Sequence, residues 1–178
     1  MAHDEQSPQP LLAVKDLNIA FVHPGGETAI TRDVSFTVGA GERVGVVGES
    51  GCGKTVTGLS LLGLLPKRTA RVRGEILFQG RDLLKMPARE LRRLRGREIS
   101  MIFQEPMSAL DPVFTIGEQL CETLRAHYPV SRKEARERAI AALEEVGIPS
   151  PHLRLDDYPY QFSGGMRQRV MIAMALIC

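Results

Sequence analysis

A glycine-rich octapeptide, residues 48–55, constrains the fold of this 178-residue chain more than any other segment. Its sequence is Gly48-Glu49-Ser50-Gly51-Cys52-Gly53-Lys54-Thr55, and it follows the apolar residues 43–47. Glycines let backbone N–H groups converge on one point, which side chains would otherwise block. Several phosphate oxygens need that convergence. The segment therefore predicts a phosphate-binding loop between a buried strand and a helix.

Two residues of this loop supply a charge and a metal ligand. Lys54 provides a cation for the outer phosphates of a nucleoside triphosphate, and Thr55 provides a hydroxyl for Mg²⁺. The positive end of the following helix points at the same place. A chance glycine-rich turn is the simple alternative, which the strand–loop–helix pattern disfavours. Cys52 is interpreted as a small space-filling residue in preference to a redox group.

Hydrophobic periodicity divides the chain into a strand-rich first part and a helical second part. Alternating residues predict antiparallel strands at 11–21 and 34–38, a turn at 24–26 and a further strand at 75–80. Residues 43–47 are apolar on both faces, as in a buried parallel strand, and 99–103 is a second candidate core strand. Helices are predicted at 55–65, 86–95, 116–128 and 131–146, the last with a Ser131/Glu134 capping box and a stop at Gly147.

A second glycine motif, Phe162-Ser163-Gly164-Gly165-Met166, begins an apolar helix. Ser163 is a good N-cap, but two glycines weaken a first turn unless something must come close to its backbone. Arg167 and Arg169 lie near the positive helix end, where cations are unfavourable unless an anion docks there. An ordinary helix start and an anion-binding helix start are both compatible with this pattern.

Two further side chains are candidate ligands. Gln104 directly follows the predicted strand 99–103, at the carboxyl end where open α/β sheets bind ligands, although an isolated Gln is also a common turn residue. Phe21 precedes the glycine-rich loop and could stack on a purine. A core position on the apolar face of its strand is the simpler alternative for Phe21.

Composition and charge exclude several classes of protein. The net charge of +2 gives no strong field for nucleic acid, and the arginines between 89 and 97 are interpreted as a solvated helix face in preference to an anionic partner's site. The three widely spaced cysteines match no metal pattern, and a reducing cytosol fits them best. No apolar segment approaches the roughly 20 residues that span a bilayer, so we expect membrane association only through a partner.

The order of these motifs resembles the ATPase subunit of ABC transporters. Residues 48–55 are similar to the Walker A loop, Gln104 to the Q-loop glutamine, and 162–166 to the signature motif, with Phe and Met where the common form has Leu and Gln. The segments GESGCGKT, SMIFQEPMSALDPVFTIGEQL and YPYQFSGGMRQRVMIAMALIC resemble the dipeptide, oligopeptide and nickel importer branch. The resemblance covers nearly the whole chain from about residue 11.

This resemblance implies an α/β fold, the P-loop NTPase ABC-type nucleotide-binding domain, with an antiparallel β subdomain, a RecA-like core and an α-helical subdomain. We expect a disordered tail at 1–10, a β and RecA-like part with Walker A at about 11–104, a helical subdomain at about 105–162, and the signature motif with its helix at 162–178. Family members continue into the Walker B strand, the catalytic Glu and the switch His. We therefore expect a truncated chain that is hydrolysis-deficient and holds no catalytic residue of its own.

The resemblance also implies ATP and Mg²⁺ as cofactors, and it assigns roles to single residues. Residues 48–55 hold the phosphates, Phe21 stacks on the adenine, Gln104 senses the γ-phosphate, and Thr55 with Gln104 serves Mg²⁺. Ser163, Gly164 and Gly165 contact the γ-phosphate of an ATP that the opposing subunit holds.

The implied function is the ATP-binding subunit of an importer that couples ATP binding and hydrolysis to uptake of peptides or a similar small solute. Its implied partners are a second ABC ATPase subunit in a homo- or heterodimer, integral-membrane permease subunits and, indirectly, a solute-binding protein, but no nucleic acid. The implied location is peripheral, on the cytoplasmic face of the inner membrane. A soluble non-transport ABC-type ATPase is the alternative, and a P-loop kinase or GTPase is disfavoured by the helical stretch between Gln104 and Ser163.

Overall fold

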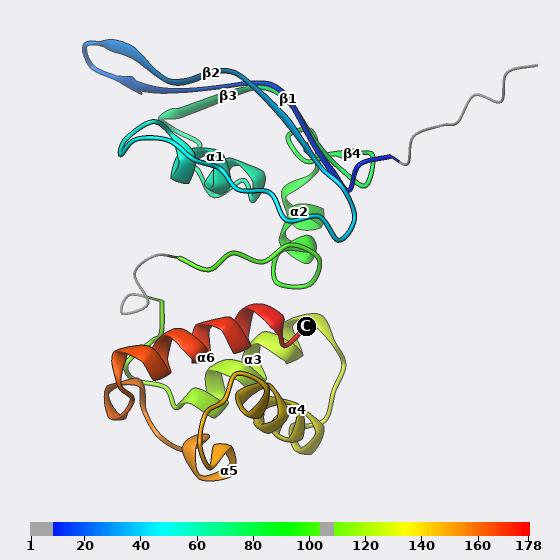
Figure 1. Ribbon diagram of the computed structural model, residues 1–178, viewed down its shortest axis with the longest axis vertical. Helices are drawn as coiled ribbons and strands as arrows, with labels where there is room; N and C mark the ends of the chain where they lie inside the picture. Colours follow the sequence, from blue (N-terminus) through cyan, green and yellow to red (C-terminus); the bar gives the residue numbers. More distant parts are fainter. Residues whose placement is uncertain (1–8, 104–108) are drawn as a thin grey trace, which may run out of the picture. The chain divides into compact units, whose positions relative to one another are not determined.

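The computed structural model describes residues 9–103 and 109–178. The chain divides into two compact units, 1–92 and 93–178, and each is described here by itself (Figure 1). The tail predicted at 1–10 lies almost entirely outside the described residues. The boundaries predicted near residues 104 and 162 stay predictions.

The first unit is built on a four-stranded antiparallel sheet in the order β2-β1-β3-β4 (Figure 1). Its strands are β1 Leu12–His23, β2 Gly26–Val38, β3 Ala70–Phe78 and β4 Arg81–Asp82. The turn predicted at 24–26 joins β1 to β2, because His23 pairs with Gly26. The predicted antiparallel pairing is confirmed, and β3 begins earlier than the sequence pattern indicates.

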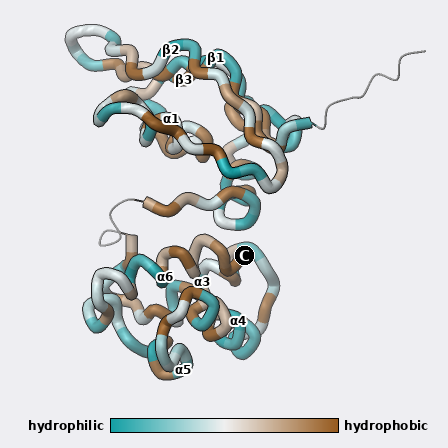
Figure 2. The backbone as a smooth tube through the Cα atoms, viewed as in Figure 1, coloured by the Kyte–Doolittle hydropathy of each residue, from teal (hydrophilic) through white to brown (hydrophobic). Residues whose placement is uncertain are grey.

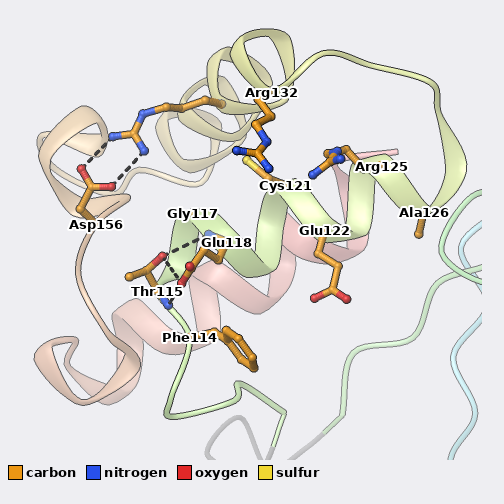
Figure 3. A pocket seen from close by; sticks show the side chains of 11 residues that line it. Phe114, Thr115, Gly117, Glu118, Cys121, Glu122, Arg125, Ala126, Arg132 and Asp156 are labelled. Carbon is orange, nitrogen blue, oxygen red and sulfur yellow. Dashed lines mark hydrogen bonds and ion pairs between the residues drawn. The ribbon is translucent and has the colours of Figure 1, made fainter.

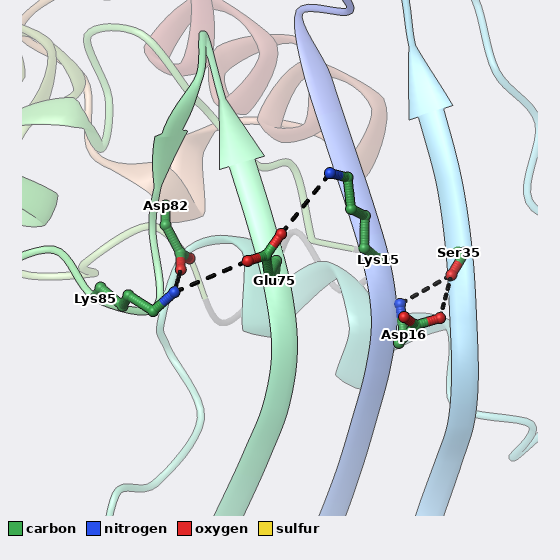
Figure 4. Close-up of polar contacts among 6 residues, drawn as sticks. All are labelled: Lys15, Asp16, Ser35, Glu75, Asp82 and Lys85. Carbon is green, nitrogen blue, oxygen red and sulfur yellow. Dashed lines mark hydrogen bonds and ion pairs between the residues drawn. The ribbon is translucent and has the colours of Figure 1, made fainter.

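A β-bulge interrupts the pairing of β1 and β3 between Lys15 and Asn18. Gly74 lies opposite with a φ of 107°, and a Cβ there would lie 2.6 Å from the Lys15 carbonyl oxygen. Only glycine fits this position, because backbone rather than a flexible side chain would have to move. The N–H of Asp16 donates to Ser35 Oγ of β2 at 2.8 Å, and the Ser35 hydroxyl donates back to the Asp16 carboxylate at 3.2 Å (Figure 4).

Charged side chains form a short network across β1, β3, β4 and Lys85, which follows β4 (Figure 4). The ammonium of Lys85 lies 2.9 Å from the Asp82 carboxylate and 3.9 Å from that of Glu75, which is 3.8 Å from Lys15 Nζ. Burial acts to raise the pKa of Asp82, but hydrogen bonds from Lys85 and the Leu84 N–H hold this pKa below its ordinary value. Because three of these four side chains are substantially exposed, solvent screening keeps the contribution of each pair to stability small.

The two predicted parallel strands are not formed, so this part of the prediction is wrong. Residues 43–47 have no regular structure, and Val44, Val46 and Val47 are 43%, 60% and 96% exposed. Residues 100–103 are also irregular, and Ile99 makes only an isolated parallel bridge with Arg95. A parallel strand is stable when other strands and helices cover it on all sides. Within the described residues, no strand pairs with residues 43–47 or 100–103.

Two helices belong to this part of the chain. α1 Lys54–Leu61 follows the glycine-rich loop and ends before Pro66, as predicted, although it is shorter than expected. α2 Ala88–Leu94 buries Leu91 and Leu94, while Arg89 and Arg92 remain exposed. These exposed arginines are compatible with a solvated helix face, and the choice between that and a site for an anionic partner stays a prediction.

The second unit is helical and has its own apolar core (Figures 1 and 2). Its elements are α3 Ile116–His127, α4 Arg132–Glu145, α5 Pro151–Arg154, the 3-10 helix η2 Pro159–Gln161 and α6 Gly164–Leu176. The fully buried residues include Leu120 of α3, Leu143 of α4 and Val170 of α6, and Phe162 joins the same cluster. Across residues 9–103 and 109–178, no helix is both long enough and apolar enough to cross a membrane.

The helix caps differ partly from the prediction. Ser131 Oγ accepts the Glu134 N–H at 3.1 Å, but the Glu134 carboxylate pairs with Arg138 at 2.7 Å rather than completing a capping box. A complete capping box instead begins α3, where the Thr115 N–H donates to Glu118 Oε2 at 2.7 Å and Thr115 Oγ1 accepts the Glu118 N–H at 3.2 Å. α4 stops at Gly147, which has a φ of 72° as a helix-ending glycine requires.

Close packing at Gly117, in the first turn of α3, gives a test of the helical core. A Cβ there would lie 2.8 Å from both Cδ2 and the carbonyl oxygen of Leu155, and this oxygen accepts the Gly117 N–H at 2.8 Å. We predict that Gly117→Ala lowers the free energy of unfolding by about 1–3 kcal/mol through overpacking, measured by urea denaturation and circular dichroism.

Gly164→Ala is the matched control, because a Cβ at Gly164 would meet open space in the first turn of α6. This control should leave the free energy of unfolding unchanged or raise it by up to about 1 kcal/mol. Equal stabilities for the two alanine variants would show that the packing of α3 against Leu155 is not as tight as described.

Candidate nucleotide-binding site

Residues 48–52 of the glycine-rich loop are exposed, Gly53 is buried, and Lys54 holds the loop closed. Lys54 Nζ donates to the Gly48 carbonyl at 2.6 Å and to the Glu49 carbonyl at 2.7 Å, and lies 3.4 Å from Cys52 Sγ. An ammonium has three donors, so each of them has an acceptor within this loop. The cation is therefore fixed against the backbone that precedes α1 rather than extended into solvent.

The glycines of this loop are needed for different physical reasons. Gly51 and Gly53 have φ values of 82° and 97°, in the left-handed region that other residues rarely adopt. A Cβ on Gly53 would also lie 2.7 Å from Thr31 Cγ2 of β2. A Cβ on Gly48 would lie 2.6 Å from Cys52 Sγ, and Cys52 itself is exposed, so its interpretation as a space-filling residue stays a prediction.

The N-terminus of α1 is suited to an anion. Its N-cap, Gly53, offers no side-chain hydrogen bond, and its first turn contains no acidic residue. By contrast, Thr115, Ser131 and Ser163 each cap the helix that follows them with a side-chain oxygen. The first N–H groups of a helix need acceptors, and an uncapped start leaves them for solvent or a ligand.

The same loop offers a cation and a hydroxyl for a nucleoside triphosphate and Mg²⁺. Lys54 is held by neutral carbonyl oxygens, and a charged phosphate oxygen is a stronger acceptor than these, so the ammonium can exchange one for the other. Thr55 is exposed at the start of α1. The residues present therefore fit the phosphate and metal that the sequence predicts.

Phe21 is half-buried in β1, near the part of the sheet that the glycine-rich loop contacts. Ile19 pairs with Thr31, the residue that Gly53 approaches, while Phe21 pairs with Thr28. Two residues along a strand span about 7 Å, so the Phe21 backbone lies about that far along β1 from this contact. This position is compatible with both interpretations of Phe21, a base-stacking residue and a core residue.

Gln104 lies outside the described residues. Downstream of it, the buried Gln119 of α3 organises the chain: its amide donates to the Asp111 and Phe114 carbonyls, and its oxygen accepts the Asp111 N–H, each at 3.0 Å. The sequence analysis does not identify Gln119, because a glutamine within a helix carries no pattern that distinguishes it from a solvent-facing residue.

The signature segment exposes bare backbone at the start of α6. Ser163 Oγ accepts the Met166 N–H at 3.3 Å, as expected of an N-cap, and Ser163, Gly164 and Gly165 are all exposed. A Cβ on Gly164 or Gly165 would meet open space, and neither glycine has a positive φ. Packing among residues 9–103 and 109–178 therefore does not require glycine at either position.

The two arginines of this helix have different surroundings. Arg169 Nη1 donates to the Gly147 carbonyl at 2.8 Å, where α4 has just ended. Its place near the start of α6 thus has a structural cause within the helical unit, and no anion is needed to explain it. Arg167 Nε is buried without a hydrogen-bond acceptor among residues 9–103 and 109–178, which leaves a donor at this end of the helix unused.

A cavity of about 940 Å³ lies along α3 in the helical unit (Figure 3). It is lined by Phe114, Thr115, Gly117, Glu118, Cys121, Glu122, Arg125, Ala126, Arg132, Arg136 and Asp156. Arg136 forms a bidentate pair with Asp156, at 2.9 and 2.7 Å. Arg125 and Arg132 lie near Cys121 (Figure 3), and neither has a carboxylate partner in the part of the chain that the structure describes.

A second hollow of about 420 Å³ lies on the sheet of the first unit and includes residues of β1, β2 and β3. Neither cavity contains a residue of the glycine-rich loop. The candidate phosphate site is thus an exposed surface in this chain, because residues 43–47 before the loop are themselves exposed.

The sequence of this chain is similar to those of known transport proteins. The dipeptide transport ATP-binding protein of Bacillus subtilis (strain 168) is 51% identical over 171 residues, covering 96% of this chain and 51% of that protein. The oligopeptide transport ATP-binding protein of Salmonella typhimurium (strain LT2) is 49% identical over 176 residues, covering 97% of this chain and 52% of that protein. The chain therefore spans about half the length of the curated relatives it matches.

Solved structures confirm the predicted fold class. A bacterial ABC transporter cassette solved as a dimer has a TM-score of 0.79 and 27% identity, covering 93% of this chain and 69% of that chain. A dimeric ATP-binding cassette in a post-hydrolysis state, bound to ADP and Pi, has a TM-score of 0.77 and 26% identity with the same coverage. The family described as ABC transporter matches residues 31–178. On these grounds, the chain belongs to the ABC transporter family.

Proposed function

We propose that this chain is the ATP-binding part of a subunit that couples ATP binding and hydrolysis to the import of peptides or a similar small solute. One observation carries the proposal. The N-terminus of α1 has no side-chain cap, it follows a loop with two glycines of positive φ, and the ammonium of its first residue, Lys54, is bonded into that loop. The transport names of the relatives that are about half identical to this chain support the peptide-like substrate.

In the proposed complex, backbone N–H groups of residues 48–55 surround the phosphates of ATP. Lys54 exchanges the Gly48 and Glu49 carbonyls for the outer phosphate oxygens, and the Thr55 hydroxyl together with Gln104 holds Mg²⁺. When bound, Mg²⁺ neutralises charge on the phosphate oxygens. Phe21 stacks on the adenine, for which its position along β1 from the Gly53 contact is suitable.

The signature segment acts on a nucleotide that a second subunit holds. Gly164 and Gly165 are exposed, and a Cβ at either position would meet open space. The presence of glycine there is best explained by a group that approaches the backbone from another molecule. The γ-phosphate of an ATP bound to the opposing subunit is an anion of the right kind for the N-terminus of α6. The likeness to a cassette solved as a dimer supports this arrangement.

Transport requires that ATP-driven movement reach integral-membrane permease subunits. The cavity along α3 is the best candidate for that contact, because it is open to solvent and presents Arg125 and Arg132 to an acidic segment. Through this contact the protein would sit peripherally on the cytoplasmic face of the inner membrane. A solute-binding protein would act on the far side, without touching this chain.

Loss of the Lys54 cation tests the phosphate site. We predict that Lys54→Ala weakens Mg-ATP binding by about ten- to a hundredfold, because a hydrogen bond to a charged group contributes roughly 1.5–3 kcal/mol. Equilibrium binding of a fluorescent ATP analogue measures the effect. Lys67→Ala removes an exposed lysine outside the loop and should leave the affinity unchanged. Equal affinities for the Lys54→Ala and unmodified chains would rule out the phosphate role.

The signature glycines give a second test, in which folding and binding separate. Gly165→Ala should fold as the unmodified chain does, because its Cβ meets open space, yet it should weaken ATP-driven self-association at least about tenfold by blocking approach to the α6 backbone. Sedimentation velocity with saturating Mg-ATP measures association. Gly25→Ala, in the β1–β2 turn, is the control and should associate normally. If Gly165→Ala associates as strongly as the unmodified chain, the signature segment takes no part in a nucleotide site between two chains.

Charge reversal at the α3 cavity tests the membrane partner. Arg125→Glu should weaken binding to permease subunits by about tenfold, measured by co-purification from detergent-solubilised membranes, because an acidic segment would then face like charge. ATP affinity should not change. Arg89→Glu, on the exposed face of α2, is the matched control. If even the unmodified protein captures no permease subunit, a non-transport ABC-type ATPase becomes the better interpretation.

A further inference from the structure

Two stacked tyrosines stand exposed just before the signature segment. The ring centroids of Tyr158 and Tyr160 are 5.7 Å apart, and the ring planes differ by 11°. Tyr160 is 72% exposed and Tyr158 36%. An aromatic ring has a large apolar face, so an ordered ring left in water is available for stacking on a ligand.

The turn that carries these rings is held firmly. The Tyr158 N–H donates to Gln161 Oε1 at 2.8 Å, and the Gln161 N–H donates back to the Tyr158 carbonyl at 2.9 Å. The Phe162 N–H donates to the carbonyl of the buried Pro159 at 3.2 Å. Because the backbone is fixed on both sides of Tyr160, its ring is presented to solvent instead of lying in a flexible loop.

Phe162 links this turn to α6. It is 2% exposed within the helical core, and the Arg154 guanidinium carbon lies 5.9 Å from its ring centroid. Ser163 follows and begins α6. Three residues span at most about 11 Å, so the Tyr160 backbone and the exposed signature backbone lie within the reach of one small ligand. That ligand would be aromatic at one end and anionic at the other.

A nucleotide has this chemistry, and the proposed function already brings its γ-phosphate to Ser163 and the glycines after it. We infer that Tyr160 stacks on the base of that same nucleotide, the one that the glycine-rich loop of the opposing subunit holds. The inference rests on the proposed function and adds to it a contact with the base across the subunit interface. Because every base has a π-face, Tyr160 adds affinity for a nucleotide over a base-free polyphosphate without selecting among bases.

The first experiment compares two ligands that differ only in the nucleoside. Self-association of the 178-residue chain is measured by sedimentation velocity with saturating Mg-ATP or saturating Mg-tripolyphosphate. Tyr160→Ala should weaken ATP-driven association about tenfold, a factor that lies within the range measured for base stacking. It should leave tripolyphosphate-driven association unchanged. Tyr160→Phe keeps the ring and should behave as the unmodified chain does.

The other outcomes are equally informative. If Tyr160→Ala weakens association with both ligands to the same extent, the ring supports the turn or a protein contact, and the base contact is overturned while the proposed function survives. The same holds if Tyr160→Ala associates normally with ATP. If neither ligand promotes association of the unmodified chain, the inference fails, and the proposed phosphate site fails with it only if Lys54→Ala does not alter ATP binding.

A labelling experiment then asks which chain contacts the base. An isotopically marked Lys54→Ala chain, which offers its signature segment but binds nucleotide poorly, is mixed with a Gly165→Ala chain, which binds nucleotide in its loop. Irradiation with 8-azido-ATP should label Tyr160 of the Lys54→Ala chain, identified by peptide mass spectrometry, and only when the second chain is present. Label confined to the Gly165→Ala chain would overturn the inference.

Discussion

The bonds from Lys54 to the carbonyls of Gly48 and Glu49 organise the candidate site. They close a loop whose two left-handed glycines turn the backbone toward the start of α1. The same cation that holds the loop closed is the one that a phosphate would attract. A phosphate oxygen would therefore compete with these two carbonyls as an acceptor for one ammonium.

The loop also depends on the sheet behind it. Gly53 lies so close to Thr31 that no side chain fits between loop and β2. This contact fixes the start of α1 to the antiparallel sheet, and the register of β1 and β2 then sets the distance along the strand to Phe21. The bulge at Gly74 in turn allows β3 to pair with β1 on both sides of Asp16. Packing, strand register and the candidate site are thus linked through a few glycine positions.

The glycines of the two motifs have different surroundings, and only the structure shows this difference. Gly48 and Gly53 have neighbours that a Cβ would strike, so the fold itself explains them. Among the described residues, a Cβ on Gly164 or Gly165 would meet nothing within 4 Å, so packing does not explain these two glycines. Arg169 shows the reverse case, in which a residue that looks unfavourable in sequence bonds to the Gly147 carbonyl within the same unit. Sequence patterns locate such residues, but they do not show which neighbour each residue meets.

The sequence by itself determined the features that depend on local chemistry: the antiparallel β1–β2 hairpin, the start of α1 after the glycine-rich loop, the buried face of α4 and the Ser163 cap. Their causes are contained within a few neighbouring residues, as side-chain alternation, capping hydrogen bonds and glycine conformations. Tertiary structure decided the rest. Residues 43–47 have the composition of a buried strand, yet they remain exposed because a parallel strand takes its stability from neighbours distant in sequence. For the same reason, only the structure showed that the complete capping box begins at Thr115 and not at Ser131, because this depends on which partner each nearby glutamate finds. Only the structure showed, too, that Tyr160 is held in an exposed position.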